Sequence, residues 1–312
     1  MTATRNGRLA VDAVGLRFQN PILLAAGTAA FGRELHDVVE LDRLGGLVTK
    51  AVSPHPRAGA PAPRVAEFPG GMINAVGLAN PGMAEVRKTE LPWLASHVGN
   101  ARVLVNVVGD MPEDFATVVA YLDDASGLDG YELNVSCPNV KAGGMEFGAD
   151  PRALRDVVTR ARQATRRPLF VKLSPTLADV ASAASIAVDA GADGITVVNT
   201  IPGLVVDLET RRPAVGFGSG GVSGVSLLPV GVLATWRVTR AVSVPVIGVG
   251  GVTTAEDALQ YLMAGASLVA LGTSSMRDPR TAERLVRGLE HWCDHHGVGS
   301  IGEVIGTLEW PQ

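Results

Sequence analysis

The sequence predicts an α/β fold in which eight parallel strands close into a (β/α)8 barrel. Short apolar runs rich in β-branched residues alternate along the chain with longer stretches rich in Ala, Leu and Arg. Parallel strands joined by helices produce this alternation, because each crossover helix returns the chain to the same edge of the sheet. An open, doubly wound parallel sheet gives a similar pattern and is the main alternative.

The strands are expected where short apolar runs lie between turn-forming residues. Eight runs meet this description: 22–26, 47–51, 103–107, 131–135, 169–173, 194–198, 244–249 and 268–271. The clearest helical stretches between and after them are 151–165, 177–190, 254–264 and 279–296. Asp150 before Pro151 and the segment 253–256 carry residue types that begin helices. Gly191 and Gly265 follow two of these stretches, and glycine readily takes the conformation that ends a helix.

The composition favours one domain that acts on small molecules. No linker divides the 312 residues, so a single domain spanning 1–312 is expected. The net charge of −4 gives no reason to expect nucleic acid or an anionic membrane as a partner. Two cysteines cannot build a disulfide scaffold or a four-cysteine metal cluster, and they fit a reducing, cytoplasmic setting. Residues 1–8 are polar and unlike a signal peptide, and no apolar run is long enough to span a bilayer.

Two stretches are longer than a minimal barrel needs. Residues 53–81 are rich in proline, and residues 200–226 are rich in glycine. Each follows a predicted strand, so both are expected as long loops on the C-terminal face of the barrel. Barrel enzymes build their active sites on that face, and long ordered loops are usually functional.

Polar residues and glycines recur where the predicted strands end, which indicates a shared site on the C-terminal face. They are Gly27, Thr28, Lys50, Asn106, Asn134, Lys172, Asn199, Thr200, Gly250, Gly251, Gly272 and Thr273. Lys50 and Lys172 each end an apolar strand, where lysine is uncommon unless it is paired. They are interpreted as fixed cations facing an anionic ligand or a flavin ring, and the alternative is that they reach solvent from the rim.

The glycine-containing runs after the last two strands are typical of a phosphate site. The runs 249–252 and 271–274 follow these strands, where barrels often bind phosphate through backbone N–H groups. Simple tight turns are the alternative explanation. The glycine-rich segment 218–224 does not match the G-x-G-x-x-G fingerprint, so no nicotinamide site is expected there.

The two cysteines lie in different settings. Cys137 belongs to the run Asn-Val-Ser-Cys-Pro-Asn at 134–139, just past an apolar strand, where a thiol can act as an acid or base. Cys293 lies among histidines at 291–296 on the last predicted helix, away from the strand ends. That group suggests a metal site, but a packed and solvated helix is the favoured interpretation, and no metal is expected.

The run at 134–141, with Gly143, Gly144, Phe147 and Gly148, resembles the catalytic loop of class 1 dihydroorotate dehydrogenases. Residues 72–82 resemble the family's substrate loop, and the resemblance extends from about residue 16 to residue 277. The proline-rich stretch 54–67 and the Asn-Val-Lys that follows Pro138 are most similar to subclass 1B.

The resemblance implies FMN on top of the barrel and dihydroorotate beside it. The positions that match flavin contacts are Ala26, Gly27, Lys50, Ala51, Asn106, Asn134, Lys172, Val198, Gly224, Gly250, Gly251, Gly272 and Thr273. The positions that match substrate contacts are Lys50, Asn74, Ala75, Val76, Gly77, Leu78, Asn134, Asn199 and Thr200. Ala26 departs from the family, which often has a serine there, so one hydroxyl is lost beside the flavin.

The family's chemistry is the oxidation of dihydroorotate to orotate in de novo pyrimidine (UMP) biosynthesis. The resemblance implies that Cys137 takes the C5 proton, that FMN takes the C6 hydride, and that Lys172 stabilises the charge that appears on the reduced flavin. It also implies a homodimer that associates with an electron-transfer subunit carrying FAD and an Fe–S cluster, which passes electrons to NAD. Cys137 and the short N-terminus argue against the membrane-bound class 2 enzymes, which use a serine base.

Other functions remain open from the sequence alone. A class 1A-like enzyme would reduce fumarate without a partner subunit, and a related flavoenzyme would oxidise another dihydropyrimidine. A flavin-free barrel that only binds a phosphorylated ligand is a different class of function. A purely structural subunit is a further alternative, against which Asn134, Cys137 and the two strand-end lysines all argue.

Overall fold

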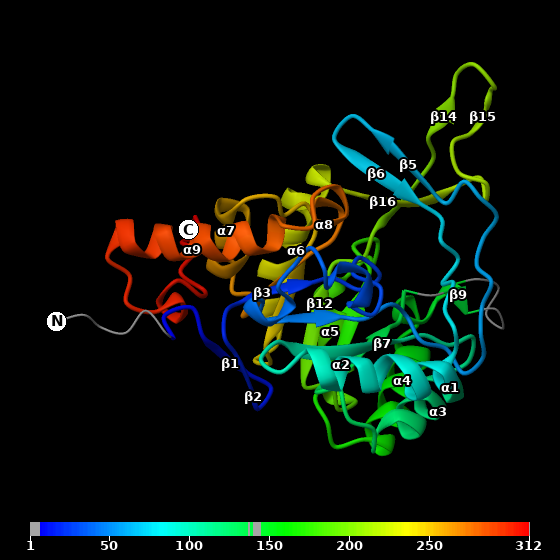
Figure 1. Ribbon diagram of the computed structural model, residues 1–312, viewed down its shortest axis with the longest axis horizontal. Helices are drawn as coiled ribbons and strands as arrows, with labels where there is room; N and C mark the ends of the chain where they lie inside the picture. The colour runs from blue at the N-terminus through cyan, green and yellow to red at the C-terminus, as the bar shows by residue number, and fades with distance from the viewer. Residues whose placement is uncertain (1–6, 137, 140–144, 312) are drawn as a thin grey trace.

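The computed structural model describes residues 7–136, 138–139 and 145–311, and its centre is a closed barrel of parallel strands (Figure 1). The strands follow one another around the barrel in chain order, and the last pairs with the first. They are β3 (Ile22–Leu24), β4 (Gly46–Val48), β7 (Arg102–Val107), β8 (Gly130–Asn134), β11 (Leu169–Leu173), β12 (Gly194–Val197), β17 (Val246–Val249) and β18 (Leu268–Leu271). The predicted (β/α)8 or TIM barrel is confirmed, and the open sheet is excluded because this sheet has no edge.

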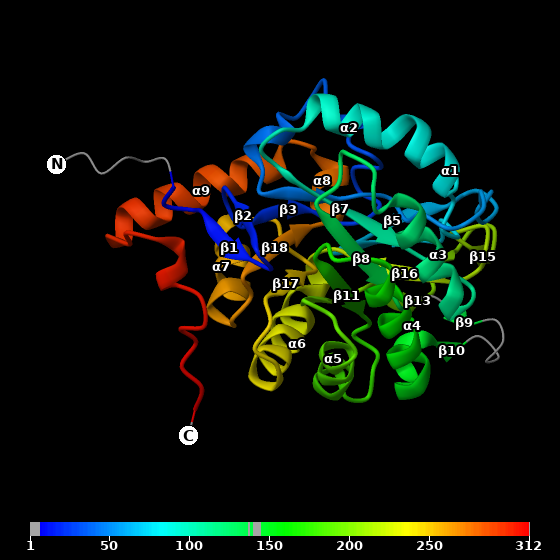
Figure 2. The ribbon, with the colours of Figure 1, turned by 90° about the horizontal axis from the view of Figure 1, so that it is seen from below.

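Helices surround the barrel on its outer side (Figure 2). The longer ones are α3 (Pro112–Leu122), α4 (Pro151–Ala164), α5 (Val180–Asp189), α6 (Leu228–Ala241), α7 (Ala255–Met263) and α9 (Thr281–His296). The shorter ones are α1 (Met83–Glu85), α2 (Leu91–His97), which follows a π-helical segment (Val86–Glu90), and α8 (Thr273–Arg277). The four predicted helical stretches are confirmed as α4, α5, α7 and α9, each slightly shorter than predicted. Among the described residues, no helix is long and apolar enough to cross a membrane.

Side-chain caps fix where α4 and α7 begin. The Asp150 carboxylate accepts hydrogen bonds from the backbone N–H groups of Arg152 and Ala153, at 2.8 and 3.4 Å. Thr254 Oγ1 accepts from the N–H of Asp257, whose carboxylate accepts in return from the N–H of Thr254. Such caps stabilise a helix by about 1 kcal/mol each. The helix-start signals in the sequence therefore predict both helix starts correctly.

The barrel strands are packed too tightly for larger residues at some positions. A Cβ atom on Gly194 of β12 would lie 2.3 Å from the ring of Phe170 on the neighbouring β11. A Cβ atom on Gly248 of β17 would lie 2.2 Å from the ring of Tyr261 on α7. Glycine is therefore required at both positions, and the two aromatic rings hold the strands in a fixed arrangement.

The two long loops pair with each other above the barrel. The first contains β5 (Val65–Phe68) and β6 (Gly71–Asn74), and the second contains β13 (Ile201–Gly203) and β16 (Gly220–Ser223). These four strands form one antiparallel sheet in the order β13-β16-β6-β5, in which Gly221 lies opposite Asn74 (Figure 1). Both loops follow barrel strands, so their predicted place on the C-terminal face is correct. Their pairing into one sheet was not predicted.

Three small hairpins complete the strands. β1 (Val11–Ala13) pairs with β2 (Leu16–Phe18) before the barrel begins. β9 (Pro138–Asn139) pairs with β10 (Met145–Glu146) after β8, and β14 (Val206–Asp207) pairs with β15 (Arg212–Pro213). Figure 1 shows that the β14–β15 hairpin projects beyond the four-stranded sheet, away from the barrel.

Candidate active site

Polar residues from three neighbouring strands meet at the C-terminal end of the barrel. Asn106 of β7 lies opposite Glu132 of β8, and Asn134 of β8 lies opposite Lys172 of β11. Because residues opposite each other in parallel strands point to the same side of the sheet, the registers place these side chains on one surface. Lys172 also lies opposite Thr196 of β12, so the polar group extends across a fourth strand.

Asn106 is fully buried and only partly hydrogen-bonded. Its side-chain Nδ2 donates to Glu132 Oε1 at 2.8 Å, and its backbone N–H donates to Thr49 Oγ1 at 3.2 Å. Its Oδ1 atom has no hydrogen-bond partner within the described part of the chain. More than about 90% of buried polar groups in native proteins have a partner. The free oxygen is therefore a position where a bound molecule can donate a hydrogen bond.

The two strand-end lysines bring positive charge to the same face. Lys172 is only 7% exposed, and Lys50 is half-buried. Within residues 7–136, 138–139 and 145–311, neither ammonium group makes an ion pair or a hydrogen bond. Burial lowers the pKa of Lys50, the positive charge of Arg64 lowers it further, and Glu34 opposes the shift. Both cations are therefore available to an anionic ligand.

Two asparagines are linked directly across the site. Asn199 follows β12 and the buried Val198, and its Nδ2 donates to Asn134 Oδ1 at 3.2 Å. The Asn199 Oδ1 atom accepts from the backbone N–H of Thr200 at 2.9 Å, and its own backbone N–H donates to Leu173 O. These bonds fix both carboxamides, so the remaining polar atom of Asn134, its Nδ2, has a set direction.

The predicted substrate loop runs beside the second long loop. Asn74 Nδ2 donates to the carbonyl of Gly221 at 3.2 Å, across the pairing of β6 with β16. The N–H of Ala75 donates to the carbonyl of Arg64 at 2.8 Å, which keeps the first loop folded back on itself. Asn74 is therefore held by the sheet that covers the barrel rather than by the barrel itself.

The rest of that loop turns sharply toward the barrel rim. The carbonyl of Val76 accepts from the N–H of Ala60 at 3.0 Å. Gly77 has a φ of +68°, and a Cβ atom on it would lie 2.4 Å from Ala60 N, so glycine is required there. Leu78 packs against the small apolar cluster formed by Ala51 and Val108, next to the end of β4. The structure thereby brings the loop to within contact of the Lys50–Ala51 strand end.

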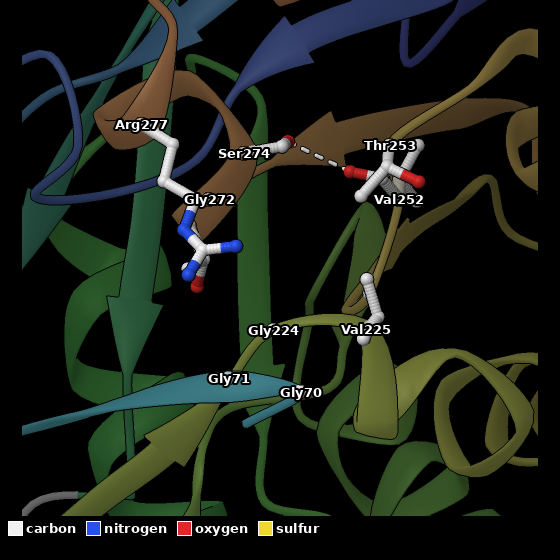
Figure 3. Close-up of a pocket in the computed structure, with 11 residues that line it drawn as sticks. Gly70, Gly71, Gly224, Val225, Val252, Thr253, Gly272, Ser274 and Arg277 are labelled. Atoms are coloured by element: carbon white, nitrogen blue, oxygen red, sulfur yellow. Dashed lines mark hydrogen bonds between the residues drawn. The ribbon is translucent and has the colours of Figure 1, made fainter. Parts of the chain in front are cut away.

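A small pocket of about 40 Å³ lies above the last two barrel strands (Figure 3). It combines residues from the first loop, the second loop and the ends of β17 and β18. The lining residues are Gly70, Gly71, Gly224, Val225, Gly251, Val252, Thr253, Gly272, Thr273, Ser274 and Arg277. Four of the predicted flavin positions, namely Gly224, Gly251, Gly272 and Thr273, thus line one pocket. Five of the lining residues are glycines, which let a ligand approach the backbone closely, so a pocket of this size suits a phosphate group.

Two glycines make room for this pocket. Gly251 has a φ of +75°, and a Cβ atom on it would lie 2.4 Å from the backbone N of Leu228. Gly224 has a φ of +110°, and a Cβ atom on it would lie 2.6 Å from the Cα of Gly71. Side chains at these positions would force the pocket walls apart, so the sequence requires glycine for shape as well as for backbone conformation.

Hydroxyl groups and one arginine complete the pocket wall. Thr273 Oγ1 donates to Ser223 Oγ at 2.7 Å. Ser274 Oγ donates to the carbonyl of Val252 at 2.7 Å (Figure 3). The Arg277 side chain lines the pocket, as Figure 3 shows. Its guanidinium forms an ion pair with Glu67 of β5 at 3.3 Å. The wall therefore carries a cation that is shared between the pocket and the covering sheet.

The other nine predicted flavin positions do not line this pocket, among them Gly250, Ala26 and Gly27. Gly250 has a φ of +127°, and its carbonyl accepts from the Tyr261 hydroxyl at 2.7 Å. Ala26 is half-buried and Gly27 is exposed with a φ of +79°, both just past the end of β3. Cys137 lies outside the described residues, together with Lys141, Gly143 and Gly144 of the same run.

Several pocket residues were not singled out from the sequence. These residues are Gly70, Gly71, Val225 and Arg277, and all four line the pocket. Pro69-Gly70-Gly71 is a turn signal between two apolar runs, which predicts a hairpin, but nothing in the sequence places that hairpin above β17 and β18. The contact depends on the pairing of two loops far apart in the chain.

The second cysteine is remote from this face. Cys293 is fully buried on α9, and burial raises the pKa of its thiol. Within the described residues, no group of three or more His, Cys, Asp or Glu side chains is placed to hold a metal ion.

Comparison with known proteins identifies the family. A family model described as dihydroorotate dehydrogenase matches residues 8–292. The protein of Pelobacter propionicus named dihydroorotate dehydrogenase B (NAD(+)), catalytic subunit, is 43% identical over 301 residues, covering 96% of this chain and 98% of that protein. Proteins with the same name from Geotalea uraniireducens and Geobacillus kaustophilus are each 42% identical over 96% of this chain, covering 98% and 95% of their own lengths. The chain belongs to the dihydroorotate dehydrogenase family.

Proposed function

We propose that this chain is the catalytic subunit of a B-type dihydroorotate dehydrogenase, an oxidoreductase that converts dihydroorotate to orotate in pyrimidine biosynthesis. The observation that carries the proposal is 43% identity along 96% of the chain with a protein that bears this name. The strand-end lysines and asparagines add chemical support, because they present cations and amides to a small anionic ligand. We further propose that residues 1–312 act as one domain.

The family implies a flavin, and we propose FMN. The pocket of about 40 Å³ beside Gly251 and Gly272 suits the single phosphate of FMN. The free Oδ1 of buried Asn106 and the unpaired ammonium of Lys172 suit a polar ring system that becomes anionic on reduction. Bound FMN supplies the acceptor for the substrate hydride. The proposed holding residues are Ala26, Gly27, Lys50, Ala51, Asn106, Asn134, Lys172, Val198, Gly224, Gly250, Gly251, Gly272 and Thr273.

The chain's own residues would bind and orient the substrate. Lys50 carries a partly desolvated positive charge that attracts the substrate carboxylate. The hydrogen-bonded pair of Asn134 and Asn199 directs amide groups toward ring carbonyl and N–H groups, which restricts the substrate to one orientation. The proposed substrate residues are Lys50, Asn74, Ala75, Val76, Gly77, Leu78, Asn134, Asn199 and Thr200.

We assign the proton transfer to Cys137, which follows β8 in the sequence. The thiol would accept the proton from C5 of dihydroorotate. A free thiol has a pKa of about 8.5, so the reactive thiolate is a minor form at neutral pH unless its surroundings favour it. Lys172 would stabilise negative charge that develops beside it during the reaction.

The names of the relatives imply a separate partner subunit. We propose that this partner carries FAD and a 2Fe–2S cluster, that it passes electrons to NAD⁺, and that it associates with a homodimer of this chain in the cytoplasm. The support is the printed name of the B-type relatives, which specifies NAD(+) and a catalytic subunit.

Anaerobic titration of the purified protein with dihydroorotate tests the activity. We expect the flavin absorbance to bleach in proportion to the orotate formed. Reoxidation is then compared with fumarate alone, with NAD⁺ alone, and with NAD⁺ plus the partner subunit. Rapid reoxidation by fumarate would favour the A-type alternative, and a preparation without flavin absorbance that cannot be reconstituted with FMN would contradict the proposal.

A further inference from the structure

One buried carboxyl group inside the barrel has no part in the function described above. Glu132 lies in the middle of β8 and is 1% exposed. The single hydrogen bond recorded for its side chain within the described residues is the one that it accepts from Asn106 Nδ2 at 2.8 Å. A buried carboxyl group is costly unless it is compensated, so a leucine would be the more stable choice at a position that served packing alone.

The chemistry of Glu132 determines which way the Asn106 amide points. A carboxylate only accepts hydrogen bonds, so the Nδ2 atom of Asn106 has to face it and the Oδ1 atom has to face away. The backbone of Asn106 is held separately, because its N–H donates to Thr49 Oγ1 at 3.2 Å. With the backbone and one end of the amide both fixed, the direction of Oδ1 is set before any ligand arrives.

That Oδ1 atom is buried and has no partner within the described residues. It lies near the end of β7, and Glu132 is two residues before Asn134, which is opposite Lys172. The free acceptor therefore belongs to the strand-end group assigned to the flavin. A ligand that satisfies it has to present an N–H or O–H donor. The oxidised flavin ring system carries one N–H group, at N3.

We propose that Glu132 is a positioning residue for the flavin, which holds the Asn106 amide so that Oδ1 accepts from the flavin N3–H. The inference rests on the proposed function, because it requires that FMN binds on this face. An apolar residue at position 132 would accept no hydrogen bond from Asn106 Nδ2 and would leave the amide orientation less restricted. The carboxyl group thus presents an acceptor to the N3–H, where a reversed amide would oppose one N–H donor with another.

The test measures flavin binding by the apoprotein, without turnover. The flavin is removed, and the protein is titrated with FMN and with FMN methylated at N3, which lacks the N–H donor. Quenching of flavin fluorescence reports the dissociation constants. The variants are Glu132→Met, Glu132→Gln, Asn106→Leu and the double variant Asn106→Leu/Glu132→Met, with Thr235→Val as the control. Thr235 lies on α6, and its Oγ1 is likewise buried without a partner in the described residues.

The wild-type apoprotein is expected to prefer FMN over its N3-methyl form by about 10- to 100-fold, the value of one buried hydrogen bond. Glu132→Met should lose most of this preference, and Glu132→Gln should retain it, because the glutamine oxygen can accept the same hydrogen bond. Once Asn106 is leucine, Glu132→Met should have no further effect on the preference. Thr235→Val should bind both flavins as the wild type does.

Three results would overturn the inference. The first is a wild type that binds both flavins equally well, and the second is a Glu132→Met protein that keeps the full preference. The third is a Glu132→Gln protein as impaired as Glu132→Met, since that outcome would assign the effect to charge. If Glu132→Met does not fold, judged by circular dichroism, an Asn106→Leu protein that retains the preference contradicts the inference equally. A wild type that binds no flavin would instead contradict the proposed function.

Discussion

The two ends of the barrel treat their charged groups in opposite ways. At the N-terminal end, the aspartates that come just before strands accept hydrogen bonds from an arginine and from a backbone N–H. Asp129, before β8, accepts from Arg102 and from the N–H of Val103. Asp193, before β12, accepts from Arg162 and from the N–H of Leu169. At the C-terminal end, the Lys172 ammonium and the Asn106 Oδ1 atom have no hydrogen-bond partner within the described residues. One end therefore serves stability, and the other end leaves polar groups for ligands.

Arg162 illustrates the pairing at the N-terminal end of the barrel. Arg162 on α4 donates to the carboxylate of Asp193 at 2.6 Å and to the carbonyls of Thr165 and Arg167 at 2.6 and 2.9 Å. It thereby closes the turn between α4 and β11 and ties it to the turn before β12. Charge-assisted bonds of this kind are among the stronger ones in proteins.

Lys172 illustrates the unpaired groups at the C-terminal end of the barrel. It is almost as buried as a core residue, at 7% exposure, yet it has no ion pair within the part of the chain that the structure describes. A buried cation without a partner costs stability. The comparison predicts that substitutions at the two ends change activity and stability independently.

The largest effect on activity is expected for Cys137→Ala. Removal of a general base slows a reaction by about 10²- to 10⁴-fold, so the variant should bind FMN and orotate but lose most dihydroorotate oxidation at neutral pH. Stopped-flow flavin reduction measures the loss. Cys137→Ser should keep some activity, shifted to high pH because an alcohol is a weaker acid than a thiol. Oxidation by Cys137→Ala at the wild-type rate would remove this residue as the base.

Lys172→Met should separate activity from stability most clearly. Loss of one fixed charge beside the reacting groups should slow flavin reduction by about 10²- to 10³-fold. The apoprotein should be at least as stable as the wild type, because an apolar side chain of similar length replaces an unpaired buried cation. Flavin reduction and thermal unfolding measure the two effects. Lys88→Met, on an exposed lysine, is the control that should change neither.

Arg162→Ala should give the opposite result at the N-terminal end of the barrel. Loss of three hydrogen bonds, with the Asp193 carboxylate left less compensated, should lower the free energy of unfolding by about 2 to 4 kcal/mol. The rate of flavin reduction should not change. Urea denaturation of the apoprotein measures the loss, and Arg166→Ala, on an exposed neighbour, should stay within about 0.5 kcal/mol of the wild type. A fall in rate without a fall in stability would show that the two ends are coupled.

The barrel and its strand ends were predictable from local sequence. The apolar runs have the length of buried parallel strands, and they alternate along the chain with helical stretches. Polar residues lie at the ends of these runs, namely Lys50, Asn106, Asn134 and Lys172. In a parallel barrel every strand end points to the same face, so finding the strands also finds the face. The helix starts at Asp150 and Thr254 were predictable for the same reason, because a capping side chain acts within its own turn.

The covering sheet and the full pocket were not predictable. The pairing of Gly221 with Asn74 joins two loops at positions that lie 147 residues apart in the chain. The place of Arg277 in the pocket depends in turn on its bond to Glu67 in that sheet. The direction of the free Asn106 Oδ1 atom depends on the hydrogen bond between Asn106 and Glu132. These two residues are neighbours only because of the register between β7 and β8. Local patterns contain no information about such long-range contacts, which require the register of the folded chain.

The smallest effect is expected at Lys50, which tests the C-terminal end of the barrel through the pH dependence of stability and of orotate binding. Burial, with Arg64, lowers its pKa below the ordinary value of 10.5, and the unfolded chain keeps the ordinary value. Between the lowered pKa and 10.5 the unfolded chain binds more protons, so this residue should make the free energy of unfolding rise with pH in that window. Orotate binding should weaken in the same window, because the ammonium loses its charge. Urea denaturation and orotate titration of the wild type and of Lys50→Met measure both slopes. Each slope should be smaller in the variant, and an equal slope in both proteins would assign the pH dependence to another group.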